Sequence, residues 1–329
     1  MIVQNKAVLI LMTTYNGSKY IKEQIESIIN QSYTKWKLII RDDGSSDGTR
    51  EILQEFESNE GRITVIENSS DKHGAYLNFW TLINYAKALS RYDYYFFADQ
   101  DDVWLPKKIE RMIDFDMRQE NRENARLIYA DMQIIDGKGE IVYPSIDEVM
   151  GIGEISGLSL FYTHGYLWGC DTMINMRLFD LVPALSTNNP NIAIMSHDNY
   201  YGKFALLFGE IKYFREICIK HRRYGGNTTG SYQIKMTLAS ALTQVIINWN
   251  DLLRTHAKVY TQTLITLSQM EKMDFLSREM MEIRKSIDYG GTTGVLILAK
   301  YKVKRKQVVR TLGIYLIMFL KMYRKYIIL

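Results

Sequence analysis

Three carboxylates stand close together in the stretch FADQDDVW, which runs from Phe97 to Trp104. Asp99, Asp101 and Asp102 follow the apolar and aromatic run YDYYFF, which is typical of a buried strand. Since no basic residue lies between them, their charges repel one another unless a cation is bound. Carboxylate oxygens at this spacing suit Mg²⁺ or Mn²⁺, which usually also bind the phosphates of a nucleotide. The stretch therefore predicts a divalent cation site, the alternative being that Asp101 and Asp102 only cap the helix expected from Pro106.

Alternating strands and helices must position these acids. Apolar, β-branched or aromatic runs predict strands at 8–13, 36–43, 63–68 and 92–99, and apolar residues at helical spacing lie between them. Such alternation favours right-handed βαβ units and a parallel sheet, in which ligands bind at the carboxyl ends of the strands. Polar clusters follow three of these strands, TTYN, DDGS and DQDD. They should share one edge of the sheet.

Length and composition fit one large α/β domain with an appendage, because the chain has 329 residues, 47% of them hydrophobic, and only four prolines. A helical pattern begins near Ile234, just after GGNTTG interrupts the chain. We therefore predict one domain at 1–230 and a helical C-terminal region at 231–329. Two cysteines are too few for a disulfide framework or a zinc site of their own. The amino-terminal apolar run lacks the basic region and cleavage site of a signal peptide, which predicts a cytosolic chain.

The net charge of +4 is unevenly placed, since no acid follows Asp288 while lysines and arginines recur to the end. The apolar run at 311–320 is shorter than the roughly 20 residues of a spanning helix. It predicts peripheral contact with an anionic membrane, the apolar side chains entering the interface. Those side chains are Leu312, Ile314, Leu316, Ile317 and Phe319. A solvated helix face and a packing or homo-oligomer surface are the alternatives. No nucleic-acid partner is expected, because an apolar stripe interleaves the basic residues and no recognition motif accompanies them.

Three motifs together resemble a known family: TTYNG at 13–17, RDDGSSDGT at 41–49 and ADQDDVW at 98–104. They are similar to the family 2 glycosyltransferases, which are inverting GT-A enzymes, and within them to the rhamnosyltransferase-like group of bacterial polysaccharide biosynthesis. The resemblance covers roughly residues 5 to 230. It implies an α/β, Rossmann-like GT-A fold with a mostly parallel central sheet flanked by helices, to which the C-terminal helical appendage is added.

The resemblance also implies how a nucleotide-sugar is held. Thr13 and Tyr15 are expected to contact the nucleotide, and Asp43 to accept a hydrogen bond from its base. For Tyr15, ordinary core packing is the alternative. Asp99 is expected near the ribose or the metal, and Asp101 as a ligand of the Mg²⁺ or Mn²⁺ that bridges the diphosphate.

Downstream, MSHDNYYGKFALLFG at 195–209 resembles the family's acceptor-side segment, in which an Asp is the catalytic base. Inversion in a single displacement needs one carboxylate to take the proton from the attacking hydroxyl, and Asp198 fits that role. The other interpretation is that His197 and Asp198 cap the following helix.

The stretch CIKHRRYGGNTTG at 218–230 resembles the family's loop near the diphosphate, where Arg222 is a plausible phosphate contact. The family's His two residues later is Tyr224 here. His221 could compensate as a metal ligand, or it could be a surface histidine in a basic loop. Asn227 and Gly230 are expected to shape a turn.

Between these segments, WGCDTMINMRLF at 168–179 resembles the small-residue segment where the acceptor and the donor sugar meet. Gly169 and Cys170 would let a sugar approach the backbone closely. Trp168 could stack on a sugar ring or belong to the core. An inverting reaction needs no covalent intermediate, so Cys170 is not expected to be a nucleophile.

These residues predict a metal-dependent inverting glycosyltransferase, peripheral at the inner face of the cytoplasmic membrane, with a lipid-linked or oligosaccharide acceptor. By resemblance, rhamnose from dTDP-rhamnose is the first donor to consider, and a hexose or N-acetylhexosamine from UDP is the alternative. A catalytically degenerate nucleotide-binding scaffold protein also stays open. A sugar nucleotidyltransferase or a dinucleotide-dependent oxidoreductase would need a glycine-rich phosphate loop after the first strand, which TTYNG is not.

Overall fold

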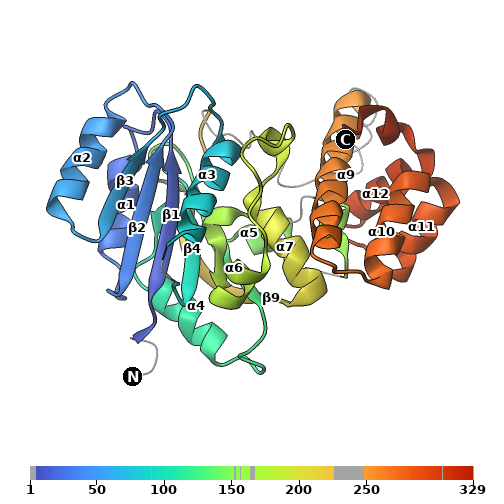
Figure 1. Ribbon diagram of the computed structural model, residues 1–329, viewed down its shortest axis with the longest axis horizontal. Helices are drawn as coiled ribbons and strands as arrows, with labels where there is room; N and C mark the ends of the chain where they lie inside the picture. Colours follow the sequence, from blue (N-terminus) through green and yellow to red (C-terminus); the bar gives the residue numbers. More distant parts are fainter. Residues whose placement is uncertain are drawn as a thin grey trace. The chain divides into compact units, whose positions relative to one another are not determined.

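The computed structural model describes residues 5–89, 91–151, 153–155, 157–163, 167–225, 248–305 and 307–328. The chain divides into two compact units (Figure 1). Unit 1 comprises residues 1–147 and 167–231, and unit 2 comprises residues 148–166 and 232–329. The segment 148–166 therefore groups with the C-terminal helices, which no local pattern in the sequence indicated. Asn227 and Gly230, and the boundary expected there, lie outside the described residues.

Unit 1 is built on four parallel strands, which Figure 1 shows side by side in the order β3, β2, β1 and β4. They are β1 (Val8–Thr14), β2 (Trp36–Asp42), β3 (Ile63–Glu67) and β4 (Tyr94–Ala98). The helices that connect them are α1 (Ile21–Ile29), α2 (Thr49–Asn59) and α3 (Ala75–Lys87). Every residue of β1 and β4 is buried, which explains their unbroken apolar runs. All four predicted strands are confirmed to within one or two residues at their ends.

The sheet continues past β4 with strands of both directions. β8 (Thr172–Asn175) runs antiparallel to β4 and to β6 (Arg126–Ile135), while β9 (Glu210–Arg222) runs parallel to β6. Two short strands, β5 (Val103–Trp104) and β7 (Ile141–Tyr143), pair antiparallel with β9 and β6. The α/β architecture with flanking helices is confirmed, and the sheet is mixed because these later strands join it.

Three further helices of unit 1 follow the strands. They are α4 (Lys108–Met117), α6 (Met176–Leu181) and α7 (His197–Phe208). The helix expected from Pro106 begins two residues later, at Lys108. Buried α4 residues such as Ile109 and Met112 account for the apolar period in the sequence.

Unit 2 is helical in its described part. Its elements are α5 (Ile146–Met150), which straddles the division, η2 (Ser159–Phe161), α9 (Trp249–Lys272), α10 (Arg278–Tyr289), α11 (Gly291–Lys300), α12 (Val308–Leu320) and η5 (Met322–Tyr326). Gly290 and Gly291, with φ of 56° and 60°, turn the chain between α10 and α11. The segment 157–163 is fastened here by Thr263, whose hydroxyl donates to the Phe161 carbonyl at 2.7 Å.

The C-terminal helix α12 has one buried and one exposed face. Ile314 and Ile317 are buried in unit 2, so the expectation that they enter a membrane is wrong. Leu312, Leu316 and Phe319 are exposed, together with Val308. Among the described residues, no helix combines the length and the apolar character needed to cross a membrane.

Candidate active site

A pocket of about 550 Å³ opens at the carboxyl ends of the parallel strands of unit 1. It lies at the edge of the sheet where the polar clusters were expected to meet. Most of the predicted site residues line it, namely Thr13, Tyr15, Asp43, Asp99, Asp101, Trp168, Gly169 and Asp198. Cys170 and Arg222 are not among its lining residues.

Gln100 ties the end of β1 to the loop after β4. Its Oε1 accepts from the Thr14 hydroxyl at 2.6 Å and from the Tyr15 backbone N–H at 2.8 Å, while its Nε2 donates to the Tyr15 carbonyl at 3.1 Å. A Cβ added to Gly17 would lie 2.5 Å from that same Oε1, so the glycine of TTYNG leaves room for this side chain. The role of Gln100 depends on a contact across 85 residues, which the sequence pattern does not reveal.

The loops after β1 and β2 are joined in the same way. The Asn16 N–H donates to Ser45 Oγ at 2.8 Å, and the Gly17 N–H donates to Thr49 Oγ1 at 2.8 Å. A third hydrogen bond runs in the opposite direction, from the Ser46 N–H to Asn16 Oδ1 at 2.9 Å. Tyr15 projects from this junction with 54% of its surface exposed, which excludes the core-packing alternative.

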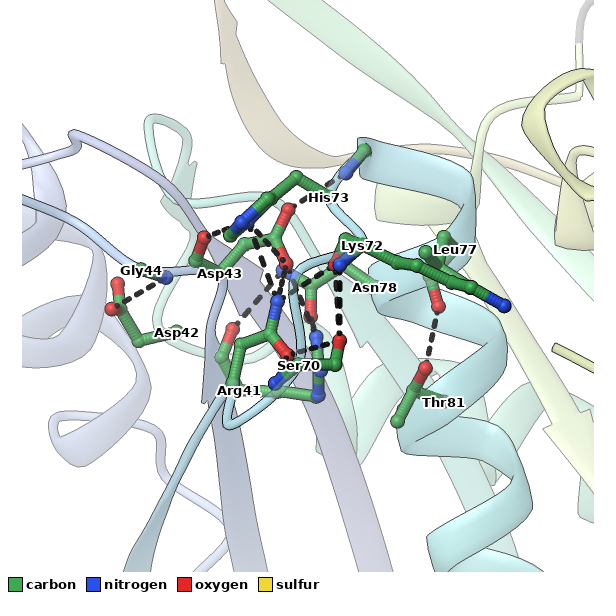
Figure 2. A network of polar contacts seen from close by, with 12 residues as sticks. Arg41, Asp42, Asp43, Gly44, Ser70, Lys72, His73, Leu77, Asn78 and Thr81 are labelled. Atoms are coloured by element: carbon green, nitrogen blue, oxygen red, sulfur yellow. Dashed lines mark hydrogen bonds and ion pairs between the residues drawn. The ribbon is translucent and has the colours of Figure 1, made fainter.

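Asp43 is buried at the centre of a polar network (Figure 2). Its Oδ1 accepts from Arg41 Nη1 at 3.3 Å and from Asn68 Nδ2 at 2.9 Å, and its Oδ2 accepts from the Gly74 N–H at 2.8 Å. Asn78 accepts from the same arginine at 2.6 Å. The carboxylate is thereby held rigidly at the pocket wall, with lone pairs left for one more donor.

Asp99 and Asp101 both have raised pKa values, in agreement with the repulsion between carboxylates that the sequence predicted. Burial first, and then the charges of Asp102 and Asp101, raise the pKa of Asp99 to about 7. Burial and the charge of Asp102 raise the pKa of Asp101 to about 6, although the Tyr224 hydroxyl hydrogen-bonds to its carboxylate. Asp99 has no hydrogen-bond partner among the residues that the structure describes, and it faces the pocket. Two neighbouring carboxylates that resist ionisation, one of them unpaired, fit a hard divalent cation.

Asp102 differs from Asp99 and Asp101 because its pKa is lowered rather than raised. Its Oδ1 lies 2.9 Å from His221 Nδ1 and accepts from the Arg222 N–H at 3.1 Å. Burial opposes its ionisation, but the charge and hydrogen bond of His221 outweigh burial and lower its pKa. His221 is only 6% exposed and lines the pocket, so the surface-histidine interpretation is wrong.

Arg222 is engaged with the protein itself. Its guanidinium contacts the Asp101 carbonyl at 2.9 Å and Glu23 Oε2 at 2.5 Å, and it lies 4.5 Å from the centroid of the Tyr20 ring. These contacts, and the position of its side chain outside the pocket lining, favour a role in supporting the acidic loop over the expected phosphate contact.

Asp198 and Gly169 lie together in the pocket lining. The Gly169 N–H donates to Asp198 Oδ2 at 3.1 Å. Ser196 is the residue preceding α7 and Asp198 lies in its first turn, so the carboxylate is not the cap of that helix. Its charge still suits the positive end of the helix dipole. The arrangement leaves a carboxylate open to the pocket, held from behind by a backbone donor.

Trp168 and Gly169 line the pocket as expected, whereas Cys170 does not. Trp168 is half-buried and lines the pocket, which favours a contact with ligand over a place in the core. Cys170 is buried beneath, where its thiol hydrogen-bonds to Asp102, and burial raises the pKa of the thiol well above its usual range. A protonated, enclosed thiol agrees with the expectation that Cys170 is not a nucleophile.

Two lining histidines were not assigned by the sequence. His73 Nδ1 lies 2.8 Å from the Asp43 carbonyl oxygen, at the wall formed by the network of Figure 2. His197 appeared there only as a helix cap, yet its ring borders the pocket. The residues next to His73 and His197 in the sequence do not indicate where their rings will lie, so neither role could be read from the sequence.

Comparisons with known proteins agree with this geometry. Residues 9–130 match the model of glycosyl transferase family 2. The dTDP-rhamnosyl transferase RfbG of Shigella flexneri is 43% identical over 104 residues, which are 31% of this chain and 36% of that protein. The putative teichuronic acid biosynthesis glycosyltransferase TuaG of Bacillus subtilis is 35% identical over 114 residues, 34% of this chain and 42% of that protein. The chain thus spans well under half the length of either relative.

Among solved structures, the S. aureus TarS fragment in complex with UDP-GlcNAc is similar with a TM-score of 0.52. The likeness covers 97% of this chain and 89% of that one at 14% identity, which shows the fold alone. The expected GT-A fold is thereby confirmed. The motifs TTYNG, RDDGSSDGT and ADQDDVW all fall within 9–130, the part of the chain that matches the model of glycosyl transferase family 2.

Proposed function

We propose that this protein is a metal-dependent inverting glycosyltransferase, which moves a sugar from a nucleoside diphosphate to an acceptor hydroxyl. The observation that carries the proposal is a single pocket lined by Asp99, Asp101 and Asp198. The charge of Asp198 acts on Asp99, so the two groups share one electrostatic environment. Asp99 and Asp101 suit a cation with a diphosphate, and Asp198 suits a base.

The nucleotide half of the site rests on the loops after β1 and β2. Thr13 and the exposed ring of Tyr15 would contact the nucleotide, and the fixed carboxylate of Asp43 would accept from its base. Asp99 and Asp101 would hold Mg²⁺ or Mn²⁺, which when bound offsets the negative charge of the departing diphosphate. Burial and the charge of Asp102 raise the pKa values of both acids, which supports this assignment because a cation would offset these unfavourable effects.

Asp198 would act as the base of a single displacement. Its carboxylate takes the proton from the acceptor hydroxyl while the acceptor oxygen bonds to the anomeric carbon. The bond from that carbon to the diphosphate oxygen breaks in the same step, and the electron pair leaves with the nucleoside diphosphate. Attack from the face opposite the leaving group inverts the anomeric centre.

Rhamnose from dTDP-rhamnose is the donor that we propose first, since RfbG is named a dTDP-rhamnosyl transferase. A UDP-linked hexose or N-acetylhexosamine is the second, because the TarS fragment of the same fold binds UDP-GlcNAc. The acceptor would be lipid-linked or a growing oligosaccharide. Peripheral contact of the exposed face of α12 with the inner face of the cytoplasmic membrane would bring the site to such an acceptor.

A thermal-shift panel tests the proposal. UDP, dTDP, GDP and CDP, each with and without Mn²⁺, should include one nucleotide that raises the Tm only when the cation is present. Asp101→Asn should abolish that shift, whereas Glu26→Gln, an exposed acid on α1, should keep it. Asp198→Asn should keep the shift but lower kcat by about 10² to 10⁴. Absence of any nucleotide shift in the wild type would favour the degenerate scaffold.

A further inference from the structure

His197 is the first residue of α7, and its side chain is buried. Only 5% of its surface is exposed. Its ring lies between two phenylalanines, with its centroid 4.1 Å from that of Phe79 and 4.4 Å from that of Phe97. Neither Nδ1 nor Nε2 has a hydrogen-bond partner in the described part of the chain.

Such an arrangement is costly unless something else pairs with the ring. Buried side-chain nitrogens in folded proteins nearly always have a hydrogen-bond partner, so each exception calls for a ligand or another explanation. Burial also lowers the pKa of His197 to about 4, against the opposing influence of Asp198. The imidazole is therefore neutral near pH 7, with one N–H donor and one lone pair to offer.

Space for the ring is made by a glycine at the pocket wall. A Cβ added to Gly169 would lie 2.4 Å from His197 Nε2. The same glycine holds Asp198 through its N–H at 3.1 Å, and all three residues border the pocket. The His197 ring thus borders the pocket together with the proposed base, Asp198.

We propose that His197 is a specificity-determining residue that hydrogen-bonds a hydroxyl group of the donor sugar. This inference rests on the proposed function and names the part of the substrate that the pocket selects. A neutral imidazole can donate to one hydroxyl or accept from it, whereas a nucleoside diphosphate without the sugar leaves both nitrogens unpaired. A buried polar group that expects a hydroxyl discriminates strongly against ligands that lack it.

Calorimetric titration of the full chain with Mn²⁺ separates the sugar from the nucleotide. The ligands are dTDP, UDP, dTDP-rhamnose, UDP-glucose and UDP-GlcNAc. His197→Phe retains an aromatic ring between Phe79 and Phe97 but removes both nitrogens. It should bind the free nucleoside diphosphate within about twofold of the wild type and the preferred nucleotide-sugar about tenfold or more weakly.

His197→Asn restores a donor and an acceptor and should recover part of the lost affinity. His256→Phe, the same change in unit 2, is the matched control and should leave both affinities unchanged. In ¹⁵N spectra of histidine-labelled protein, the nucleotide-sugar should shift a ring nitrogen of His197 and the free nucleoside diphosphate should not.

An equal loss for the free nucleoside diphosphate would assign His197 a structural role and overturn the inference. Unchanged binding of every nucleotide-sugar in His197→Phe would also overturn it, including the case in which the ring contacts the acceptor instead. If the wild type binds no nucleoside diphosphate at all, the proposed function itself fails, and the inference falls with it for that separate reason.

Discussion

Asp99 and Asp102 lie three positions apart, and their pKa values are shifted in opposite directions. Without a cation, the pKa of Asp99 is raised by burial and by its acidic neighbours to about 7. A carboxyl whose pKa is raised on folding stabilises the fold only at low pH, and this contribution is lost as the pH rises through about 7. The pKa of Asp102 is lowered, because His221 outweighs burial, so its contribution is present at neutral pH and is lost on acidification.

Asp99→Asn is therefore expected to stabilise the cation-free protein at pH 8, by roughly 2 to 4 kcal/mol. Asp102→Asn should destabilise it at the same pH, since it leaves the buried His221 without its partner. Urea unfolding at pH 8 in the presence of a chelator measures both. Destabilisation by Asp99→Asn under these conditions would contradict the proposed repulsion.

Site residues with a chemically distinctive side chain, such as a carboxylate after an apolar strand, could be predicted from the sequence. Asp99, Asp101, Tyr15 and Asp198 all line the pocket, whereas Asp102 is paired with His221 beneath it. The positions of Gln100 and His197 could not be predicted in this way, because they depend on residues distant in the sequence. Gln100 contacts the backbone of Tyr15, and the ring of His197 packs between Phe79 and Phe97.

Helix α12 shows how an apolar segment is divided between two environments. Val308, Leu312, Leu316 and Phe319 recur at helical spacing, and all are exposed, by 69%, 61%, 45% and 51%. Ile314 and Ile317 of the same run face the core of unit 2. Hydropathy identified α12 as an apolar segment, but the packing of unit 2 determines which of its apolar residues are buried and which are exposed to solvent. None of the strands from β5 to β9 was predicted. For β5, β7 and β8 the reason is their length, because two to four residues are too few to show a period.

The exposed face of α12 is expected to bind anionic bilayers. Leu312→Glu with Leu316→Glu should reduce sedimentation with vesicles of phosphatidylglycerol and phosphatidylcholine about tenfold or more, because two buried leucines contribute about 1.5 to 3 kcal/mol each. Met281→Glu on α10, also exposed, should have little effect. If the double variant sediments like the wild type, the face serves packing or oligomerisation instead.

At the level of the whole chain, two histidines, one in each unit, make the fold sensitive to acid. His197 is buried and His256 is half-buried, and the enclosure of their ring atoms lowers both pKa values to about 4. Nδ1 of His256 is enclosed without a hydrogen-bond partner in the described part of unit 2. A histidine whose pKa is depressed on folding stabilises the fold fully above the unfolded pKa of about 6.5, and this stability is lost as the pH falls through about 4.

His256→Phe should therefore flatten the pH dependence of stability. Between pH 7 and pH 4 the wild type is expected to lose about 3 kcal/mol through this residue, and the variant should not. Thermal unfolding across that range measures the difference in slope. Parallel curves for the two proteins would show that His256 is already protonated, or reaches solvent, in the folded state.

Gly169 and His197 have a consequence for attempts to alter this protein. A methyl group at position 169 would lie 2.4 Å from the imidazole, which two phenylalanines hold in place, so Gly169→Ala alone should be poorly tolerated. Replacing His197 with a smaller residue would remove that clash and make the same alanine harmless. The effect of a change at one position thus depends on the residue at the other. A library that seeks a new sugar preference should vary the two codons together, because single-site scans would discard the combinations that work.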